Sequence, residues 1–255
     1  MSRLAAICAA VIFLGVPIVV MLLPATLAKR AVDQLEGVDA IRFNGTLWHG
    51  QSLLILQNGP TANLRWQLQD LTHAKSTELF GLQPKFDWTL QNSDFEITGT
   101  IGLRRTSAEV KIAGDINSSA LAPLLNRFDI FLSGDFTLAP GTVLAPYRTA
   151  SLQQVTLVEP VDLLWSGGQV SYILSGQFNQ VDLPSLQAKV TQTTDQTLIA
   201  TVQTVTAEKL LDIVLRTNGV VVIRLNRRFL DLLAYPWPGE QDPEDIVIEV
   251  ERRIL

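Results

Sequence analysis

The chain has 255 residues and a formal net charge of −5, which together exclude some classes of protein. A protein that binds DNA or RNA normally carries a basic face or stripe, and the acidic balance gives no sign of one. Cys8 is the only cysteine, so an intramolecular disulfide is impossible. Because 47% of the residues are hydrophobic, the chain can build a core without such cross-links.

Residues 4–23 contain no charged side chain. At about 1.5 Å per residue, a helix of this length spans about 30 Å, the thickness of the hydrocarbon core of a bilayer. Lys29 and Arg30 then mark the return to water. We therefore expect a transmembrane anchor with a helical extension at residues 1–36 and a separate β-rich domain at residues 37–255.

A cleaved signal peptide is the alternative for the N-terminal segment. Thr26 and Ala28 are small residues of the kind that precede a cleavage site. The apolar run is longer, however, than the roughly 7–15 residues of a typical signal-peptide core. Charge does not fix the orientation in the membrane, because Arg3 precedes the run while Lys29 and Arg30 follow it.

Beyond the N-terminal segment, the dominant period is two. Leu64, Trp66 and Leu68 alternate with polar residues, and residues 85–91 repeat the pattern. Such alternation is typical of antiparallel strands that bury one face. Further alternating stretches lie at 95–103, 108–116, 128–138, 172–178, 198–202, 211–215 and 246–250.

Turns and helices complete the predicted pattern. Asn218-Gly219 between two apolar runs predicts a tight hairpin. Helix is expected only at residues 118–126 and 226–234, and both segments are short. The chain is therefore predicted to be all-β: a single N-terminal transmembrane helix followed by a curved antiparallel β-sheet or a flattened β-sandwich with one or two short helices. Both architectures have the same period, so the sequence does not choose between them.

An apolar alternation with a glycine at its centre recurs four times. In each copy the glycine takes a position that the alternation reserves for a core residue: Gly99, Gly114, Gly134 and Gly176. A glycine inside a strand often marks a bend, a bulge or a close backbone approach, so a strongly coiled sheet is one expectation. The other expectation is that each glycine leaves space for a large neighbouring side chain such as Trp88.

A six-residue motif, Gly45-Thr46-Leu47-Trp48-His49-Gly50, follows the N-terminal run and precedes an apolar strand and the alternation around Trp66. This arrangement resembles the general secretion pathway protein N family of type II secretion, with its single membrane helix and its Gly-Thr-aliphatic-Trp-x-Gly motif ahead of a β-rich region. The specific match covers residues 40–70. We expect the two glycines to supply turns or close approach, Trp48 to plug the end of the sheet, and His49 to be exposed. Direct contact of Trp48 with a partner is the alternative.

The resemblance implies a single-pass protein of the bacterial inner membrane with its C-terminal domain in the periplasm. Its partners would be other subunits of the type II secretion inner-membrane platform, with the secretin as a further candidate. The machine exports folded proteins across the outer membrane. The family has no known catalytic site, so the resemblance carries over no catalytic, cofactor-binding or metal-binding residue.

The residues themselves offer little for catalysis. His49 and His73 lack both a nearby cysteine and the spacing that zinc sites use. The chain contains neither a phosphate-binding glycine loop nor a Gly-x-Ser-x-Gly elbow. Arg104-Arg105 and Arg227-Arg228 are expected in solvated turns or helix caps. We expect no enzyme activity, no cofactor and no metal.

Lipid handling is the competing function. A protein resembling the AsmA/TamB type would hold acyl chains on the apolar face of a coiled antiparallel sheet, and the anchor and strands fit this function equally well. The discriminating feature is whether packing closes the apolar face or leaves it open. A periplasmic enzyme is a third alternative, and the lack of a catalytic motif argues against it.

Overall fold

The computed structural model describes residues 22–27, 29, 38–56, 60–73, 82–126, 129–146, 155–174 and 177–253. Most of these residues lie in β-strands, as the sequence predicts. The anchor expected at residues 1–36 lies almost entirely outside the described part. Within the described part, no helix has both the length and the apolar character needed to cross a bilayer.

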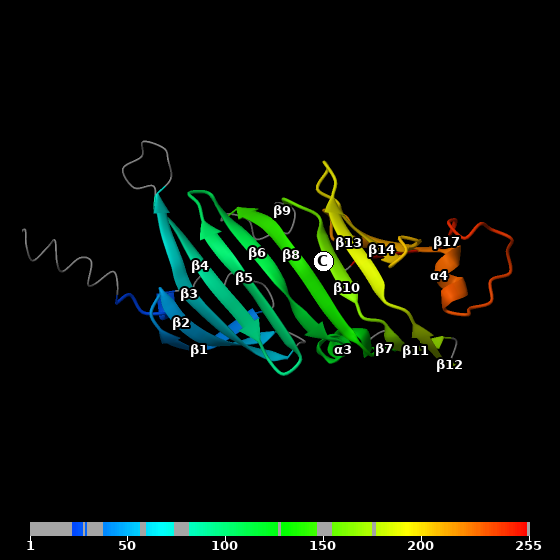
Figure 1. Cartoon of the computed structure of the whole chain (residues 1–255), viewed down its shortest axis with the longest axis horizontal. Coiled ribbons are helices and arrows are strands. Elements are labelled where there is room, and N and C mark those ends of the chain that lie inside the picture. Colours follow the sequence, from blue (N-terminus) through cyan, green and yellow to red (C-terminus); the bar gives the residue numbers. More distant parts are fainter. Residues whose placement is uncertain are drawn as a thin grey trace, which may run out of the picture.

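One long antiparallel sheet dominates the structure (Figure 1). In spatial order, its strands are β1 (Val38–Gly45), β2 (His49–Leu56), β3 (Thr61–His73), β4 (Leu82–Gln91), β5 (Phe95–Leu103), β6 (Ser107–Asn117), β8 (Asp135–Pro146), β10 (Val161–Trp165), β13 (Leu186–Gln192), β14 (Leu198–Thr204), β15 (Lys209–Leu215), β16 (Val220–Asn226) and β17 (Ile246–Arg253). A two-residue strand, β9 (Thr156–Leu157), also pairs with β8. The spatial order follows the chain order. Each strand of this sheet therefore pairs with the strand of the same sheet that precedes it in the sequence.

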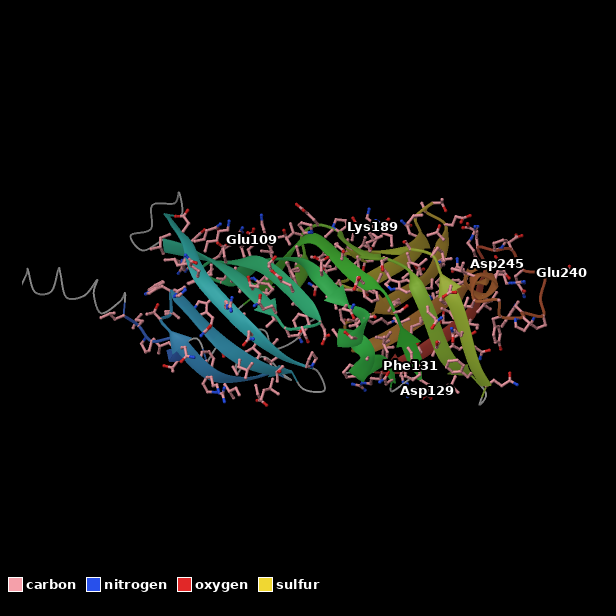
Figure 2. All side chains as sticks on the ribbon, turned by 60° about the horizontal axis from the view of Figure 1, so that its bottom comes forward. Glu109, Asp129, Phe131, Lys189, Glu240 and Asp245 are labelled. Carbon is pink, nitrogen blue, oxygen red and sulfur yellow. The ribbon has the colours of Figure 1, made fainter. Side chains whose placement is uncertain are left out.

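Three strands leave this main sheet and form a second, smaller one. They are β7 (Ile130–Leu132), β11 (Gly168–Leu174) and β12 (Gln177–Leu183), with β11 in the middle. Figure 2 shows this second sheet in front of the C-terminal strands of the main sheet. The C-terminal half of the molecule therefore has two layers.

The two predicted helical segments are present and short. A single 3₁₀ turn, Ser118–Leu121, continues into α3 (Ala122–Leu125), and α4 (Arg227–Leu232) follows β16 directly. Asn117 begins the first of them, because its side chain accepts a hydrogen bond from the Ser119 N–H.

Glycine allows the chain to pass between the two sheets. The alternation at 128–138 suggests one strand, but the structure divides it at Gly134 into β7 and β8, which belong to different sheets. Gly134 has φ +93°, and a Cβ there would lie 2.3 Å from the Gly167 carbonyl oxygen. Sequence alternation alone misses this break, because the pattern of side chains continues across it.

Hydrogen bonds fix the same crossing point. The Trp165 indole N–H donates to the Ser133 carbonyl oxygen at 3.0 Å, and the Gln169 N–H donates to Ser133 Oγ at 2.7 Å. Ser166 Oγ in turn accepts from the Asp135 N–H at 2.9 Å. Ser133 and Ser166, which lie between strands, thus pair with polar groups at the ends of the adjoining strands.

Short polar turns connect the remaining strands. Between β4 and β5, Asn92 Oδ1 accepts hydrogen bonds from the Asp94 and Phe95 N–H groups, which forms an Asx turn. The hairpin predicted at Asn218-Gly219 joins β15 to β16, and Gly219 has φ +77°. The turn chemistry visible in the sequence therefore predicts the Asn218-Gly219 hairpin correctly.

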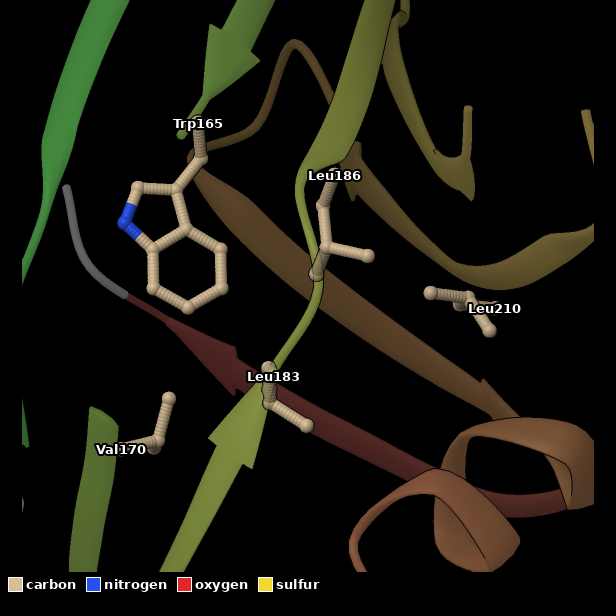
Figure 3. Packing of buried hydrophobic residues seen from close by; sticks show 5 residues of the cluster. All are labelled: Trp165, Val170, Leu183, Leu186 and Leu210. Carbon is tan, nitrogen blue, oxygen red and sulfur yellow. The ribbon is translucent and has the colours of Figure 1, made fainter. Parts of the chain in front are cut away.

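The compact core lies between the two layers of the C-terminal half. Its buried members are Trp165, Val170, Leu183, Leu186 and Leu210, and they come from both sheets (Figure 3). Phe229, Leu232 and Leu233 from α4 and its C-terminal end pack against this cluster. The helix thus closes one side of the space between the layers.

We expect truncation of a core side chain to destabilise the protein far more than truncation of an exposed one. Leu210 is 0% exposed, whereas Leu164 is 44% exposed. Leu210→Ala should lower the free energy of unfolding by about 2–5 kcal/mol, and Leu164→Ala by less than about 0.5 kcal/mol. Denaturant unfolding of the full-length protein, followed by tryptophan fluorescence, measures both. Equal losses in the free energy of unfolding would contradict the burial of Leu210 between the layers.

Candidate functional site

Two tryptophans and two glycines form a row across four neighbouring strands. In register, Gly50 pairs with Trp66, Trp66 with Trp88, and Trp88 with Gly99. A Cβ on Gly50 would lie 2.4 Å from Trp66 Cζ2, and a Cβ on Gly99 would lie 2.9 Å from Trp88 Cε2. Each glycine therefore leaves room for the indole beside it, and larger residues at these positions would displace the rings.

The six-residue motif forms the turn at one end of this row. Gly45 has φ +95°, and the Thr46 N–H donates to the His49 carbonyl oxygen at 2.8 Å. The Trp66 indole N–H donates to the Leu47 carbonyl oxygen at 3.0 Å, which fixes the turn to β3. The structure thus brings together five predicted motif positions, Gly45, Thr46, Leu47, Trp48 and Gly50, and joins them to Trp66.

Trp48 lies at the rim of the sheet. It stacks on Phe86 of β4, with ring centroids 6.4 Å apart and planes 9° apart. The Trp48 carbonyl oxygen also accepts the Leu68 N–H at 2.6 Å. Trp48 is half-buried, whereas His49 is exposed as expected. The indole therefore covers the end of the apolar face.

The motif also holds the segment that follows the uncharged N-terminal run. The Leu47 N–H donates to the Leu23 carbonyl oxygen at 2.7 Å, and the Ala25 N–H donates to the Gly45 carbonyl oxygen at 3.2 Å. Ala25 is 1% exposed. Sequence analysis missed this contact, because no spacing rule links residues that lie about twenty positions apart in unlike segments.

One row of mostly apolar side chains crosses the main sheet from β3 to β17. Directly paired residues on antiparallel strands share a face, so the pairing register traces the row. Its members are Leu64, Leu90, Ile97, Gly114, Leu138, Leu163, Ala188, Val202, Leu211, Leu225 and Ile248. The apolar row is therefore continuous from β3 to β17, whereas the partner of Leu64 on β2 is the polar Ser52.

The face is covered in the C-terminal half, whereas no element that the structure describes packs over it in the N-terminal half. Among the described residues between Ala62 and Val161, no hydrophobic side chain is fully buried. From Val161 onward, β7, β11, β12 and α4 cover the face and bury Trp165 and its neighbours. We call the uncovered part, on strands β3 to β6, the open face.

The strand-centre glycines occupy three different situations. Gly99 and Gly114 lie on the open face, and the pairing of β6 with β8 shifts register between Ile112 and Gly114, as in a bulge. Gly134 is at the crossing between the sheets. Gly176 lies outside the described residues.

Among the residues that the structure describes, the histidines and carboxylates form no metal site, and His49 is separated from its nearest carboxylate in register. His49 and Asp87 both border a hollow of about 510 Å³ on the polar side of β2–β4, but Gln67 lies between them in register. In the part of the chain that the structure describes, no three His, Cys, Asp or Glu residues converge as a metal site requires. Hydrogen bonds from Thr193 and Thr197 lower the pKa of Asp195, which lies in an exposed turn.

Arg104, Arg227 and Arg228 of the two basic pairs form ion pairs. Arg104 pairs with Glu109, and Arg227 Nε lies 2.9 Å from Asp231 Oδ1. Arg228 pairs with Glu208 and, at 3.2 Å, with Glu244. These groups stabilise turns and the short helix α4, and their charges are already balanced by neighbouring carboxylates.

One polar group on the apolar side has no partner. Nε1 of Trp88 is buried and has no acceptor among the described residues. Buried donors in native proteins are normally paired with protein, water or a ligand. Single polar atoms of Asp162, Asn226 and Arg228 are buried without a partner in the same way, so this N–H does not by itself mark a binding site.

Comparison with known proteins finds no relative. No family model, no curated protein and no solved structure matches this chain. The candidate site therefore rests on the motif, the tryptophan row and the open face.

We expect Gly99 to tolerate no side chain, because both the Trp88 ring and the backbone of the neighbouring strand lie too close to it. A Cβ there would lie 1.9 Å from the Lys111 carbonyl oxygen, whereas a Cβ on Gly102 of the same strand would meet nothing nearer than 3.9 Å. Gly99→Ala should destabilise the protein by about 1–3 kcal/mol. Gly102→Ala should be neutral or stabilise by up to about 1 kcal/mol. Thermal unfolding of both variants measures the difference, and similar midpoints would contradict the close approach.

Proposed function

We propose that the protein is a non-enzymatic inner-membrane component of a type II secretion machine. An N-terminal anchor would tether it in a single pass, and the β-sheet in the periplasm would dock other platform subunits. The observation that carries the proposal is the open face. Its apolar side chains are only half-buried, and no described element packs over them. A contiguous apolar surface that the protein's own fold leaves without a covering layer is typical of an interaction site.

The motif supports the tether. The uncharged run at residues 4–23 has the length of a membrane-spanning helix. Hydrogen bonds from Leu47 and Ala25 fasten the end of that run to the turn of the motif. A rigid connection of this kind would hold the sheet at a fixed distance and angle from the membrane, as a scaffold requires.

The two edges of the sheet are less suited to docking than the open face. On β17, Glu249 forms an ion pair with Arg224 of β16 and Glu251 with Arg216 of the turn before β16, so this edge is lined with charge. On β1, the register shifts between Ile41 and Asn44, which interrupts the regular row of backbone groups. Charges and bulges both oppose the addition of another strand. Partner subunits are therefore more strongly attracted to the apolar side chains of β3 to β6.

A specific observation favours lipid handling as a second candidate. The apolar row of the open face continues without a polar residue into the covered half, through Leu138, Leu163 and Ala188. A continuous apolar surface of this kind suits an acyl chain as well as a protein. Lipid handling of the AsmA/TamB type thus remains the alternative function.

A pull-down of the full-length protein from its native membrane tests the proposal, with co-purifying proteins and lipids both identified by mass spectrometry. We expect the wild type to recover platform subunits. Ile97→Glu should lose most of them, because it places a charge in the centre of the open face. Thr98→Glu is the matched control, since the next residue on β5 points to the opposite face.

Two results would contradict the secretion scaffold. Equal recovery with Ile97→Glu and Thr98→Glu would exclude the open face as the docking surface. Enriched phospholipid without any platform subunit would replace the scaffold with lipid handling.

A further inference from the structure

A cavity of about 660 Å³ lies between the second sheet and the main sheet. Ala188, Val202 and Leu211 of the main sheet line one side, Leu132 and Val170 of the second sheet line the other, and Phe229 of α4 also borders it. Protein interiors are normally packed without voids much larger than a water molecule. The volume falls instead in the range of about 300–1,000 Å³ that is typical of ligand-binding pockets.

The lining admits only an apolar occupant. Every side chain that borders the cavity is aliphatic or aromatic, and none is charged. The Trp165 indole N–H is already paired with the Ser133 carbonyl oxygen, which leaves the Tyr172 hydroxyl as the single polar side-chain group available. A peptide or a sugar would bury polar groups here without partners, whereas an alkyl chain has none to satisfy.

Two alanines on the main sheet maintain the space. Ala188 and Ala200 border the cavity on β13 and β14, where their partners in register are larger apolar residues. Ala188, for example, pairs with Leu163 on one side and Val202 on the other. Side chains of that larger size at both positions would fill part of the volume.

The apolar surface that lines the cavity continues along the main sheet onto the open face. Phe136 and Leu163 border the cavity, and in register they pair with Ile116 and Leu138, which carry the apolar row toward β6. A flexible alkyl chain lying on the open face could therefore enter the covered half without crossing polar surface. A folded protein segment could lie on the open face but could not follow this path.

From these observations, we propose that the cavity binds one acyl chain of a membrane lipid or of a free fatty acid, with its polar end directed toward Tyr172. The proposal goes beyond the secretion scaffold and does not depend on it. It assigns a ligand to the space between the sheets, whereas the scaffold function concerns the open face.

Photo-crosslinking in cells tests the proposal on the full-length protein. Cells that produce it are supplied with a fatty acid that carries a diazirine, irradiated, and the purified protein is digested for mass spectrometry. We expect adducts on peptides from β11, β13 and β14. The mass of the intact adduct distinguishes a free fatty acid from a phospholipid into which the probe has been incorporated.

A matched pair of variants decides whether the cavity is the site. Ala188→Phe places a large side chain in the cavity, whereas Lys189→Phe adds the same side chain to the exposed, opposite face of β13 (Figure 2). Adduct yield should fall at least about tenfold in Ala188→Phe, because the binding volume is lost, and should stay at the wild-type level in Lys189→Phe. If Ala188→Phe does not fold, Ala200→Leu provides a smaller filling from β14.

The outcomes are distinct. No adduct in the wild type, adducts only outside the cavity, or equal yields from Ala188→Phe and wild type would each overturn the proposal. Recovery of platform subunits is measured on the same samples. Loss of the adduct with normal recovery of subunits would leave both functions in place, and the absence of subunits with a normal adduct would exclude the scaffold alone.

Discussion

The need to cover one apolar face of a very long antiparallel sheet is the constraint on which the rest of the structure depends. A sheet with an apolar face must pack it against another layer. Here the chain supplies that layer from itself, with β7, β11, β12 and α4. This second layer extends only over the strands of the C-terminal half, so the molecule divides into a two-layered part and a single-layered part.

The crossing at Gly134 and Gly167 makes this division possible. The chain has to leave one sheet and enter another within two residues, and both glycines have positive φ. The same crossing is held by hydrogen bonds of Ser133 and Ser166 and by the Trp165 indole. The same residues therefore hold the two layers together and direct the chain out of the main sheet. Both halves nevertheless keep the same apolar row, because the strand register continues from β6 into β8 and β10.

The single-layered half carries the features on which the proposed tethering and docking depend. Its first strands carry the six-residue motif, which holds Leu23 and Ala25 at the end of the uncharged run. Its next strands carry the tryptophan row and the open face. A protein built in this way presents an uncovered apolar surface at a position fixed relative to its N-terminal segment. That geometry suits a component that recruits partners or lipids and contains no arrangement for bond chemistry among its described residues.

The sequence by itself determined the all-β class, most of the strands, the two short helices and the Asn218-Gly219 hairpin, because alternation and turn chemistry are local properties. It also singled out Trp66 and the motif. It could not reveal that the alternation at 128–138 belongs to two sheets, since side-chain periodicity is unchanged where Gly134 turns the backbone. Nor could it show which half of the apolar face is covered, or that Leu47 holds Leu23. Those features depend on contacts between segments distant in the chain, and only the tertiary structure decides which distant segments meet.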